Sequence, residues 1–148
     1  MLTERSINAI SKQALAEYPS ECCGIVTGTT AVQHVHGCVN HADELHAKDP
    51  EQNPRTSHEA YVMDREEAER IMTAAAAQGE KILAFYHSHI DCGAYFSQMD
   101  KDVLTVFGEP EFPDAVNIVV SVQTGRIAEI KGFLWDGEKQ DFVPIDVV

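Results

Sequence analysis

The sequence lacks any apolar run long enough to cross a membrane. Its longest runs, such as AVNIVVSV from Ala115, have the length of a strand. The N-terminal segment MLTERSINAI also lacks the basic and then apolar pattern of a signal peptide. We therefore expect a cytoplasmic protein.

Basic residues are scarce: Lys and Arg number 11 against 24 Asp and Glu, for a formal net charge of -13. Such a chain repels phosphate backbones and anionic lipids, so we expect no nucleic-acid and no membrane partner. The acidic excess favours solubility, although it would also suit a basic partner. The length of 148 residues, with 44% hydrophobic and 24% charged, predicts one globular domain over residues 1–148.

Paired cysteine motifs are absent as well. The four cysteines contain no CxxC pair, which in a cytosolic protein predicts reduced thiols rather than a disulfide framework. Adjacent Cys22 and Cys23 would point to opposite faces of a strand, which suits packing. No PCxxC follows a His-x-Glu sequence, and this excludes a nucleoside deaminase.

Apolar spacing and turn residues predict a mixed set of helices and strands. Thr3 and Asp64 are suited to cap two of the helices. The predicted helices are residues 2–18, 64–78 and 97–107, and the predicted strands are residues 22–28, 31–39, 60–63, 81–89, 117–122, 128–135 and 141–147. Residues 40–57 are polar and without periodicity, which predicts a long loop. This pattern indicates an α/β or α+β domain.

A candidate metal site lies in the stretch FYHSHIDCGAYFSQMD. His87 and His89 stand two apart at the end of an apolar strand, so their imidazoles share a face, while Ser88 points to the other. Neutral imidazole is a common zinc ligand, but two histidines at this spacing are also found in ordinary cores. A mononuclear site needs a third ligand, for which Asp91 and Asp100 compete.

Asp91 would make HSHID similar to the HxHxDH motif of metallo-β-lactamase-type hydrolases. That motif needs a histidine where Cys92 stands and further histidines downstream, and this chain has none after His89. Asp100 instead belongs to Ser97-x-x-Asp100 at the start of a predicted helix. Taken alone, that pattern needs no more than a helix cap.

A rival cluster, HVHGC, contains His34, His36 and Cys38 and is followed by His41 and His46. The first three share one face of a predicted strand. No acidic residue is placed nearby, so we interpret them as the exposed face of an outer strand.

The combined pattern of His87-x-His89, seven residues, Ser97, two residues and Asp100 resembles the JAMM (MPN+) family of zinc isopeptidases. The segment YPSECCGIVTG resembles the family's glutamate-bearing segment and places Glu21 in it. The order of elements also agrees. Ile90 departs from the proline that follows the second histidine in many relatives. Residues 40–57 resemble the variable insertion of small bacterial members.

The resemblance implies a cytidine-deaminase-like JAMM/MPN domain with a mixed, curved sheet flanked by helices. It implies one zinc ion per chain held by His87, His89 and Asp100, with Glu21 as general acid/base and Ser97 as the oxyanion donor. Cys92 would be a loop thiol near the cleft.

The resemblance further implies hydrolysis of the amide or isopeptide bond after the C-terminal Gly-Gly of a ubiquitin-like protein. The short segment after Asp100 is similar to that of stand-alone bacterial members, which process small ubiquitin-like sulfur carriers, either freeing their Gly-Gly end or releasing a sulfur-bearing amino acid from it. Two alternatives stay open: a catalytically silent scaffold or binding module of the same family, and a zinc amidohydrolase of small peptides. The sequence leaves open the carrier, a homodimer and the native metal.

Overall fold

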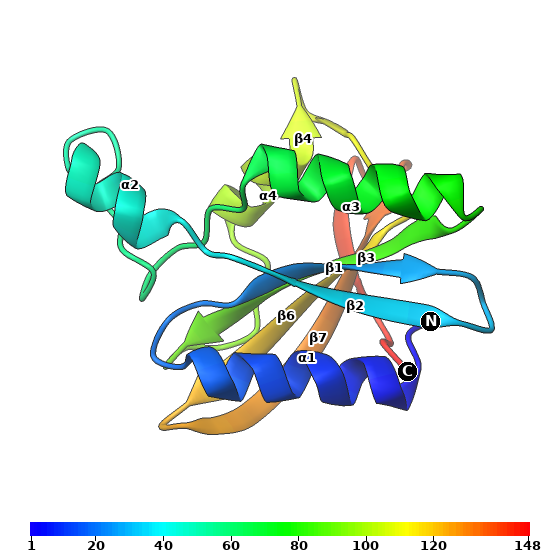
Figure 1. The fold of residues 1–148 in the computed structure, drawn as a ribbon, viewed down its shortest axis with the longest axis horizontal. Coiled ribbons are helices and arrows are strands. Elements are labelled where there is room, and N and C mark those ends of the chain that lie inside the picture. The colour runs from blue at the N-terminus through cyan, green and yellow to red at the C-terminus, as the bar shows by residue number, and fades with distance from the viewer.

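The computed structural model describes residues 1–148. Its centre is a six-stranded mixed sheet in the order β2-β1-β3-β6-β7-β8, and a two-stranded hairpin lies outside it (Figure 1). The pair β3–β6 is parallel and every other neighbouring pair is antiparallel, which confirms the predicted mixed α+β class. The strands are β1 (Cys23–Gly28), β2 (Gln33–Cys38), β3 (Lys81–Ile90), β4 (Thr105–Val106), β5 (Glu109–Pro110), β6 (Val116–Gln123), β7 (Arg126–Asp136) and β8 (Asp141–Ile145).

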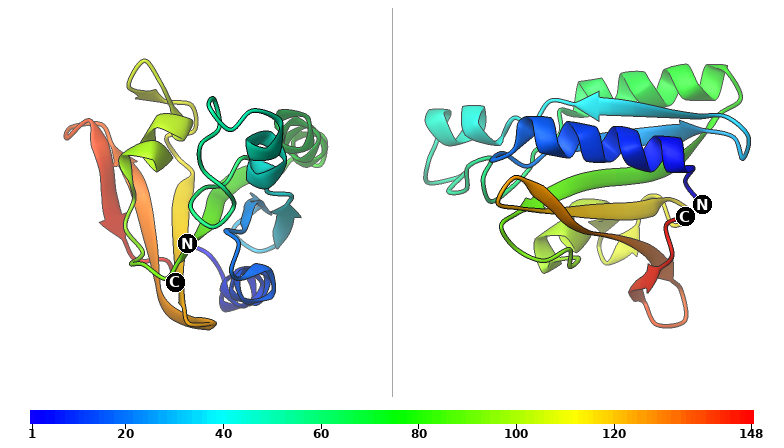
Figure 2. Two further views of the ribbon diagram at one scale, coloured as in Figure 1. Left: turned by 90° about the vertical axis from the view of Figure 1, so that its left-hand side faces the viewer. Right: turned by 90° about the horizontal axis from the view of Figure 1, so that it is seen from below.

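Helices cover both faces of this sheet. Strands β1 and β2 lie between α1 and α3, as the view along the sheet shows (Figure 2). The helices are α1 (Glu4–Glu17), α2 (Ala42–Lys48), α3 (Arg65–Ala77) and α4 (Gln98–Leu104). Thr3 and Asp64 cap α1 and α3 as predicted, each accepting a hydrogen bond from a backbone N–H in the first turn. None of the helices has the length and apolar character needed to cross a membrane.

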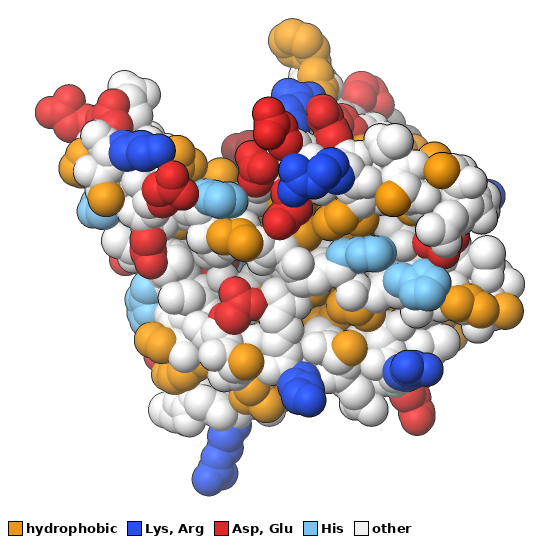
Figure 3. All heavy atoms as spheres, viewed as in Figure 1, with side chains coloured by type: hydrophobic (Ala, Val, Ile, Leu, Met, Phe, Trp, Pro, Cys, Tyr) orange, Lys and Arg blue, Asp and Glu red, His pale blue; other side chains and the backbone are white.

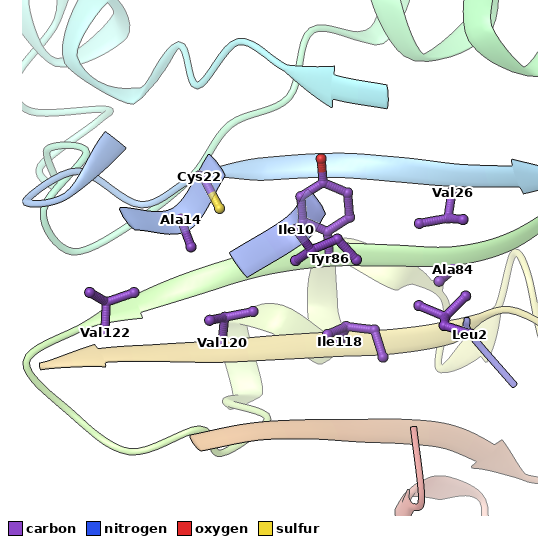
Figure 4. Close-up of a cluster of buried hydrophobic side chains, with 10 residues drawn as sticks. All are labelled: Leu2, Ile10, Ala14, Cys22, Val26, Ala84, Tyr86, Ile118, Val120 and Val122. Carbon is purple, nitrogen blue, oxygen red and sulfur yellow. The ribbon is translucent and has the colours of Figure 1, made fainter. Parts of the chain in front are cut away.

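The main core lies between α1 and the sheet (Figure 4). Ile10 and Ala14 of α1 are fully buried against Tyr86 of β3 and Ile118 of β6. Full burial of the Ile10 side chain contributes about 1.5–3 kcal/mol, so this contact holds α1 on its face of the sheet. Cys22 joins this cluster whereas Cys23 packs on the opposite face, as their adjacency predicted.

The opposite face carries two smaller clusters, one under α3 and one near α4. Cys23 and Ile25 belong to the first, and Val119, Phe133 and Phe142 to the second. His87 and His89 alternate with Tyr86 and so face this second side, at the carboxyl end of β3. The sheet therefore presents the histidines between two packed clusters.

The prediction of a long loop over residues 40–57 is wrong in part, because α2 lies within it. Asn40 Oδ1 accepts a hydrogen bond from the Ala42 N–H at the start of the helix. Glu44 in the first turn forms an ion pair with Lys48 in the last, in the order that a helix dipole favours. The helix buries only Ala42, so it leaves almost no apolar periodicity to detect.

The predicted strand over residues 60–63 is also wrong, since only a single bridge joins Asn40 to Met63. The side chain of Asn40 takes the place of a neighbouring strand: its Nδ2 donates to the Ala60 carbonyl and its Oδ1 accepts from the Val62 N–H. These backbone groups are thus satisfied without a ladder.

The predicted helix over residues 97–107 ends earlier, at Leu104. Thr105 and Val106 are β-branched and form β4, which pairs with β5 across a turn in which Phe107 and Gly108 both have positive φ. The exposed Phe107 lies in this turn.

Candidate metal centre

Three buried side chains converge at the end of β3. His87 and His89 are 3% and 6% exposed, and Asp100 in the first turn of α4 is 5% exposed. One ligand atom from each lies within 4.8 Å of the others, so the group can hold a metal ion. The strand supplies two nitrogen donors and the helix supplies the oxygen.

The two imidazole nitrogens have the spacing of ligand atoms in a tetrahedral zinc site, and the Asp100 carboxylate lies at a similar distance from each of them, through a different oxygen in each case. Ligand atoms about 2.0–2.1 Å from zinc in such a site are about 3.3–3.4 Å from one another. Here the two Nε2 atoms of His87 and His89 are 3.2 Å apart. Asp100 Oδ1 lies 3.2 Å from His87 Nε2, and Asp100 Oδ2 lies 3.4 Å from His89 Nε2. Three protein ligands leave a fourth tetrahedral position free, which is the arrangement of catalytic zinc sites.

The surroundings orient the imidazoles for this purpose. Nδ1 of His89 donates to the Gly93 carbonyl at 2.9 Å, so a neutral His89 presents its Nε2 lone pair to the centre. The His87 ring stacks on Tyr61 with the ring centroids 4.6 Å apart, which fixes its plane. Gly93 and Tyr61 were not predicted as parts of the site.

The electrostatics agree with two imidazoles facing a carboxylate. Burial lowers the pKa of His87, which favours the neutral ligand form. Burial also acts on His89, but hydrogen bonding to Asp100 and to the Gly93 carbonyl outweighs it and raises the pKa. Although burial opposes ionisation of Asp100, its hydrogen bonds with the two histidines hold the pKa well below the usual range. Asp100 is therefore an anion at neutral pH.

Asp91 and Asp100, the two candidates for the third metal ligand, lie in different surroundings. Asp100 lies in the group of three, and it also completes a capping box in which Ser97 Oγ accepts from its N–H and its Oδ2 accepts from the Ser97 N–H. Asp91 is exposed and accepts hydrogen bonds from Tyr18 Oη and the Thr124 N–H instead. Asp100 is thus part of both the helix cap and the candidate metal site.

Glu21 lies beside this group. The antiparallel register pairs Cys23 with His87, and its continuation toward the start of β1 places Glu21 opposite His89. Glu21 is 6% exposed, and burial raises the pKa of its carboxyl to about 8, while the charges of His89 and Arg55 act in the opposite direction. Such a carboxyl can exchange a proton near neutral pH.

Ser97, Glu21, His89 and Asp100 open onto one cavity of about 490 Å³. Ser97 Oγ accepts one hydrogen bond, from the Asp100 N–H, and its own hydroxyl proton stays available as a donor. Cys92 lines the same cavity, as the predicted loop thiol near the cleft. Ser88 faces away and accepts from the Cys22 N–H, in agreement with its predicted orientation.

The rival histidine cluster does not converge on one point. His34 pairs with Glu80 at 3.2 Å, whereas His36 shares a hydrogen bond with Thr27 at 2.9 Å. Cys38 is buried, so the prediction of an exposed face holds for His34 but not for this cysteine. β2 lies at the edge of the sheet, which agrees with the predicted outer strand.

Comparison with known proteins gives the family. The family of prokaryotic homologs of the JAB domain matches residues 3–146. The chain belongs to this JAB/MPN family. The resemblance seen in the sequence is thus confirmed, and the JAB/MPN fold extends over nearly the whole chain.

Solved structures share the fold of this chain. A protein from Desulfitobacterium hafniense has a TM-score of 0.69 at 19% identity, with 99% of this chain and 89% of that chain covered. A protein from Salinibacter ruber has a TM-score of 0.63 at 26% identity, with 99% and 88% covered. A JAB1/MPN domain protein from Archaeoglobus fulgidus has a TM-score of 0.50 at 14% identity, with 93% and 89% covered.

One curated protein is also similar, the tail tip assembly protein K of Escherichia phage N15. It is 32% identical over 100 residues, which are 68% of this chain. The match spans 34% of the phage protein, so this chain corresponds to about a third of that relative.

Proposed function

We propose that this JAB/MPN protein is a zinc-dependent peptidase that hydrolyses the bond after the C-terminal Gly-Gly of a ubiquitin-like protein, most simply a sulfur carrier. The observation that carries the proposal is the group of His87, His89 and Asp100, whose spacing fits a three-ligand zinc site at the edge of a cavity. We further propose that residues 1–148 act as a single domain in the cytoplasm.

His87, His89 and Asp100 would hold the zinc ion. When bound there, zinc supplies the chemistry of a hydrolytic metal site, since it lowers the pKa of water from 15.7 to about 7 and polarises a carbonyl. The three ligands are nearly fully buried, so a reacting peptide must reach the floor of the cavity. A Gly-Gly tail has no side chains and suits such an approach.

Glu21 acts as the general acid/base. Its carboxylate takes the proton of the attacking water and returns it to the nitrogen of the departing amine, two transfers for which a pKa near neutrality is favourable. Its position opposite His89 supports this role.

Ser97 donates its hydroxyl proton to the substrate carbonyl oxygen as negative charge develops on it. The Asp100 N–H already binds Ser97 Oγ, which holds the hydroxyl at the start of α4 before substrate arrives. Where such donors have been removed from other enzymes, the loss is about 2.7–4 kcal/mol of transition-state stabilisation.

A ubiquitin-fold carrier with a C-terminal extension after Gly-Gly provides the test. Zinc-loaded protein should shorten it to the Gly-Gly end in a mass spectrum, and a chelator or Glu21→Gln should prevent this. An intact carrier alongside turnover of short peptides would favour the small-peptide amidohydrolase. Zinc binding without turnover of either would favour the silent scaffold.

The similarity to the phage protein supports a second candidate, a peptidase that acts during tail tip assembly. The same assay distinguishes it when phage tail proteins are added to the panel. Chelator-sensitive cleavage of a tail protein, with the carrier left intact, would replace the carrier proposal with this one.

A further inference from the structure

A row of polar side chains crosses the sheet beside the metal centre. The parallel register pairs His89 of β3 with Ser121 of β6, and the antiparallel register pairs Ser121 with Glu129 of β7. Side chains that pair in register on neighbouring strands point to the same face of a sheet, so Glu129 lies on the face of the metal centre, two strands from His89. The proposed mechanism uses neither Ser121 nor Glu129.

Each member of this row binds one residue of the loop between β3 and α4, and the three loop residues are consecutive. The contacts are Ser121 Oγ to the Cys92 carbonyl, His89 Nδ1 to the Gly93 carbonyl at 2.9 Å, and the Ala94 N–H to Glu129 Oε1 at 2.8 Å. Ala94 is fully buried, so the Glu129 carboxylate satisfies an N–H that water does not reach. The loop that follows the two histidines is thus attached to the sheet at each of these residues.

The last two contacts share one peptide unit. The Gly93 carbonyl and the Ala94 N–H are the polar groups of a single planar trans peptide, in which they point in opposite directions. When the N–H binds Glu129 on one side, the carbonyl is directed to the other side, where it accepts from His89. A rotation of this peptide would break both hydrogen bonds at once.

The charge of Glu129 strengthens this connection. The hydrogen bond from the Ala94 N–H lowers the pKa of the Glu129 carboxyl, which is therefore ionised at neutral pH. Hydrogen bonds in a chain polarise one another, so an anion at the N–H makes the Gly93 carbonyl a better acceptor for His89. Metal-binding histidines usually donate their second N–H to a carbonyl or a carboxylate, which fixes the tautomer and the ring orientation. Here a carbonyl and a carboxylate act in series.

The backbone contact distinguishes Glu129 from other surface carboxylates. Acidic side chains are common on this protein, as one face of it shows, so a partly exposed carboxylate is by itself no sign of a role (Figure 3). Glu129 Oε2 also pairs with Lys131 at 3.4 Å, but both side chains are well exposed and such ion pairs contribute little. The contact of Oε1 with the loop is the one that leads to His89.

Resting on the proposed function, we propose that Glu129 is a positioning residue of the metal centre, which acts on His89 through the Gly93–Ala94 peptide. It keeps the imidazole proton on Nδ1 and leaves Nε2 free to bind the metal. Glu129 contacts neither the ligand atoms nor the cavity, so its effect is on metal affinity and on the hydrogen bond of His89.

Two conservative variants separate the contact from the charge. Glu129→Gln keeps an acceptor oxygen at the same reach and removes the charge, whereas Glu129→Asp keeps the charge and withdraws the oxygen by one methylene. We expect Glu129→Asp to lower zinc affinity about 10-fold, the lower end of the range for a group that supports a metal ligand, and Glu129→Gln to lose less. Competition against a chelating dye measures both.

A second readout follows the hydrogen bond itself. In an NMR spectrum of the zinc-loaded protein, the Nδ1 proton of His89 should exchange with water faster in Glu129→Asp than in the wild type or Glu129→Gln. A residue that only stabilises the fold would not change this exchange. Lys131→Gln removes the ion pair alone, and Glu138→Gln removes one exposed negative charge from the turn between β7 and β8, so both controls should keep the zinc affinity of the wild type.

Unchanged zinc affinity in Glu129→Asp would overturn the inference. A larger loss in Glu129→Gln than in Glu129→Asp would overturn it too, since the charge rather than the contact would then act. Lower stability in urea, with zinc affinity and proton exchange unchanged, would make Glu129 a structural residue and would have the same consequence. Absence of zinc from the wild type would overturn the proposed metal centre, and this inference with it.

Discussion

The replacement of Asp100 by asparagine tests the metal centre most directly. The asparagine has the shape of the aspartate and can still accept from the Ser97 N–H, so the start of α4 is retained. It removes the negative charge and one of the two oxygens that lie 3.2 Å and 3.4 Å from the histidine nitrogens. The change therefore acts on the donor set rather than on the helix.

The size of the effect follows from the ligand count. Loss of a group that only supports a metal ligand costs about 10–100-fold in affinity. Asp100 is one of three proposed ligands, so we expect zinc affinity to fall more than about 100-fold, or by about 2.7 kcal/mol or more.

Asp91→Asn is the matched control, since it removes the other aspartate of the same stretch. Asp91 has a φ of 54°, a conformation that asparagine tolerates and alanine does not favour. Its hydrogen bonds go to Tyr18 and Thr124, away from the histidines, so we expect a stability loss of at most about 1.5 kcal/mol and no loss of zinc.

Zinc per chain after gel filtration, together with competition against a chelating dye, measures both variants beside the wild type. We expect close to one zinc per chain in the wild type and in Asp91→Asn, and marked loss in Asp100→Asn. Zinc that persists in Asp100→Asn and disappears from Asp91→Asn would refute the assignment of the ligands. Absence of zinc from all three would refute zinc as the metal.

Three further predictions concern the groups around the centre. Glu21→Gln should retain zinc and lose about 100-fold or more in kcat, the lower range for general acid–base catalysis; unchanged turnover in a steady-state assay would exclude Glu21. Ser97→Ala should lower kcat about 100- to 1000-fold and, through the lost cap, destabilise the protein by about 1 kcal/mol in urea unfolding, with zinc affinity largely kept. Hydrogen bonds from Ser57 lower the pKa of Asp43, so the stability they contribute is present at neutral pH and is lost as the pH falls through the lowered pKa. The difference in unfolding free energy between wild type and Asp43→Asn should therefore shrink on acidification. A difference that stays constant with pH would contradict this.

Local patterns predicted the parts of the fold that bury a periodic apolar face. α1 and α3 could be recognised because Ile10 and Ala14 recur at helical spacing in one, and Asp64 caps the other. α2 could not, because it buries a single alanine and is held by Asn40 and by charges at its ends. Periodicity reports burial, and a helix that buries little leaves little to detect.

The candidate site, like the fold, could be predicted from the sequence only in part. His87, His89 and Asp100 lie within a few residues of two element ends, so strand and helix geometry alone can bring them near one another. The positions of Tyr61 and Arg55 depend on how a segment without periodicity packs beside the cavity. No local rule gives that path, since it depends on contacts between residues far apart in the chain.

Those contacts explain why residues 40–57 matter to the centre. Asn40 Nδ2 donates to the Glu21 carbonyl at 2.9 Å, and the Glu21 N–H donates to the Ser57 carbonyl at 2.7 Å. Asp43 of α2 in turn accepts from both the N–H and the hydroxyl of Ser57, each at 2.7 Å. Both backbone groups of Glu21 are thus bound by the segment that contains α2, and the same segment brings Arg55 to the cavity wall. Because a buried carboxyl can transfer a proton productively only when its direction is fixed, this segment is better understood as the support of the proposed acid/base than as the plain loop that the sequence predicted.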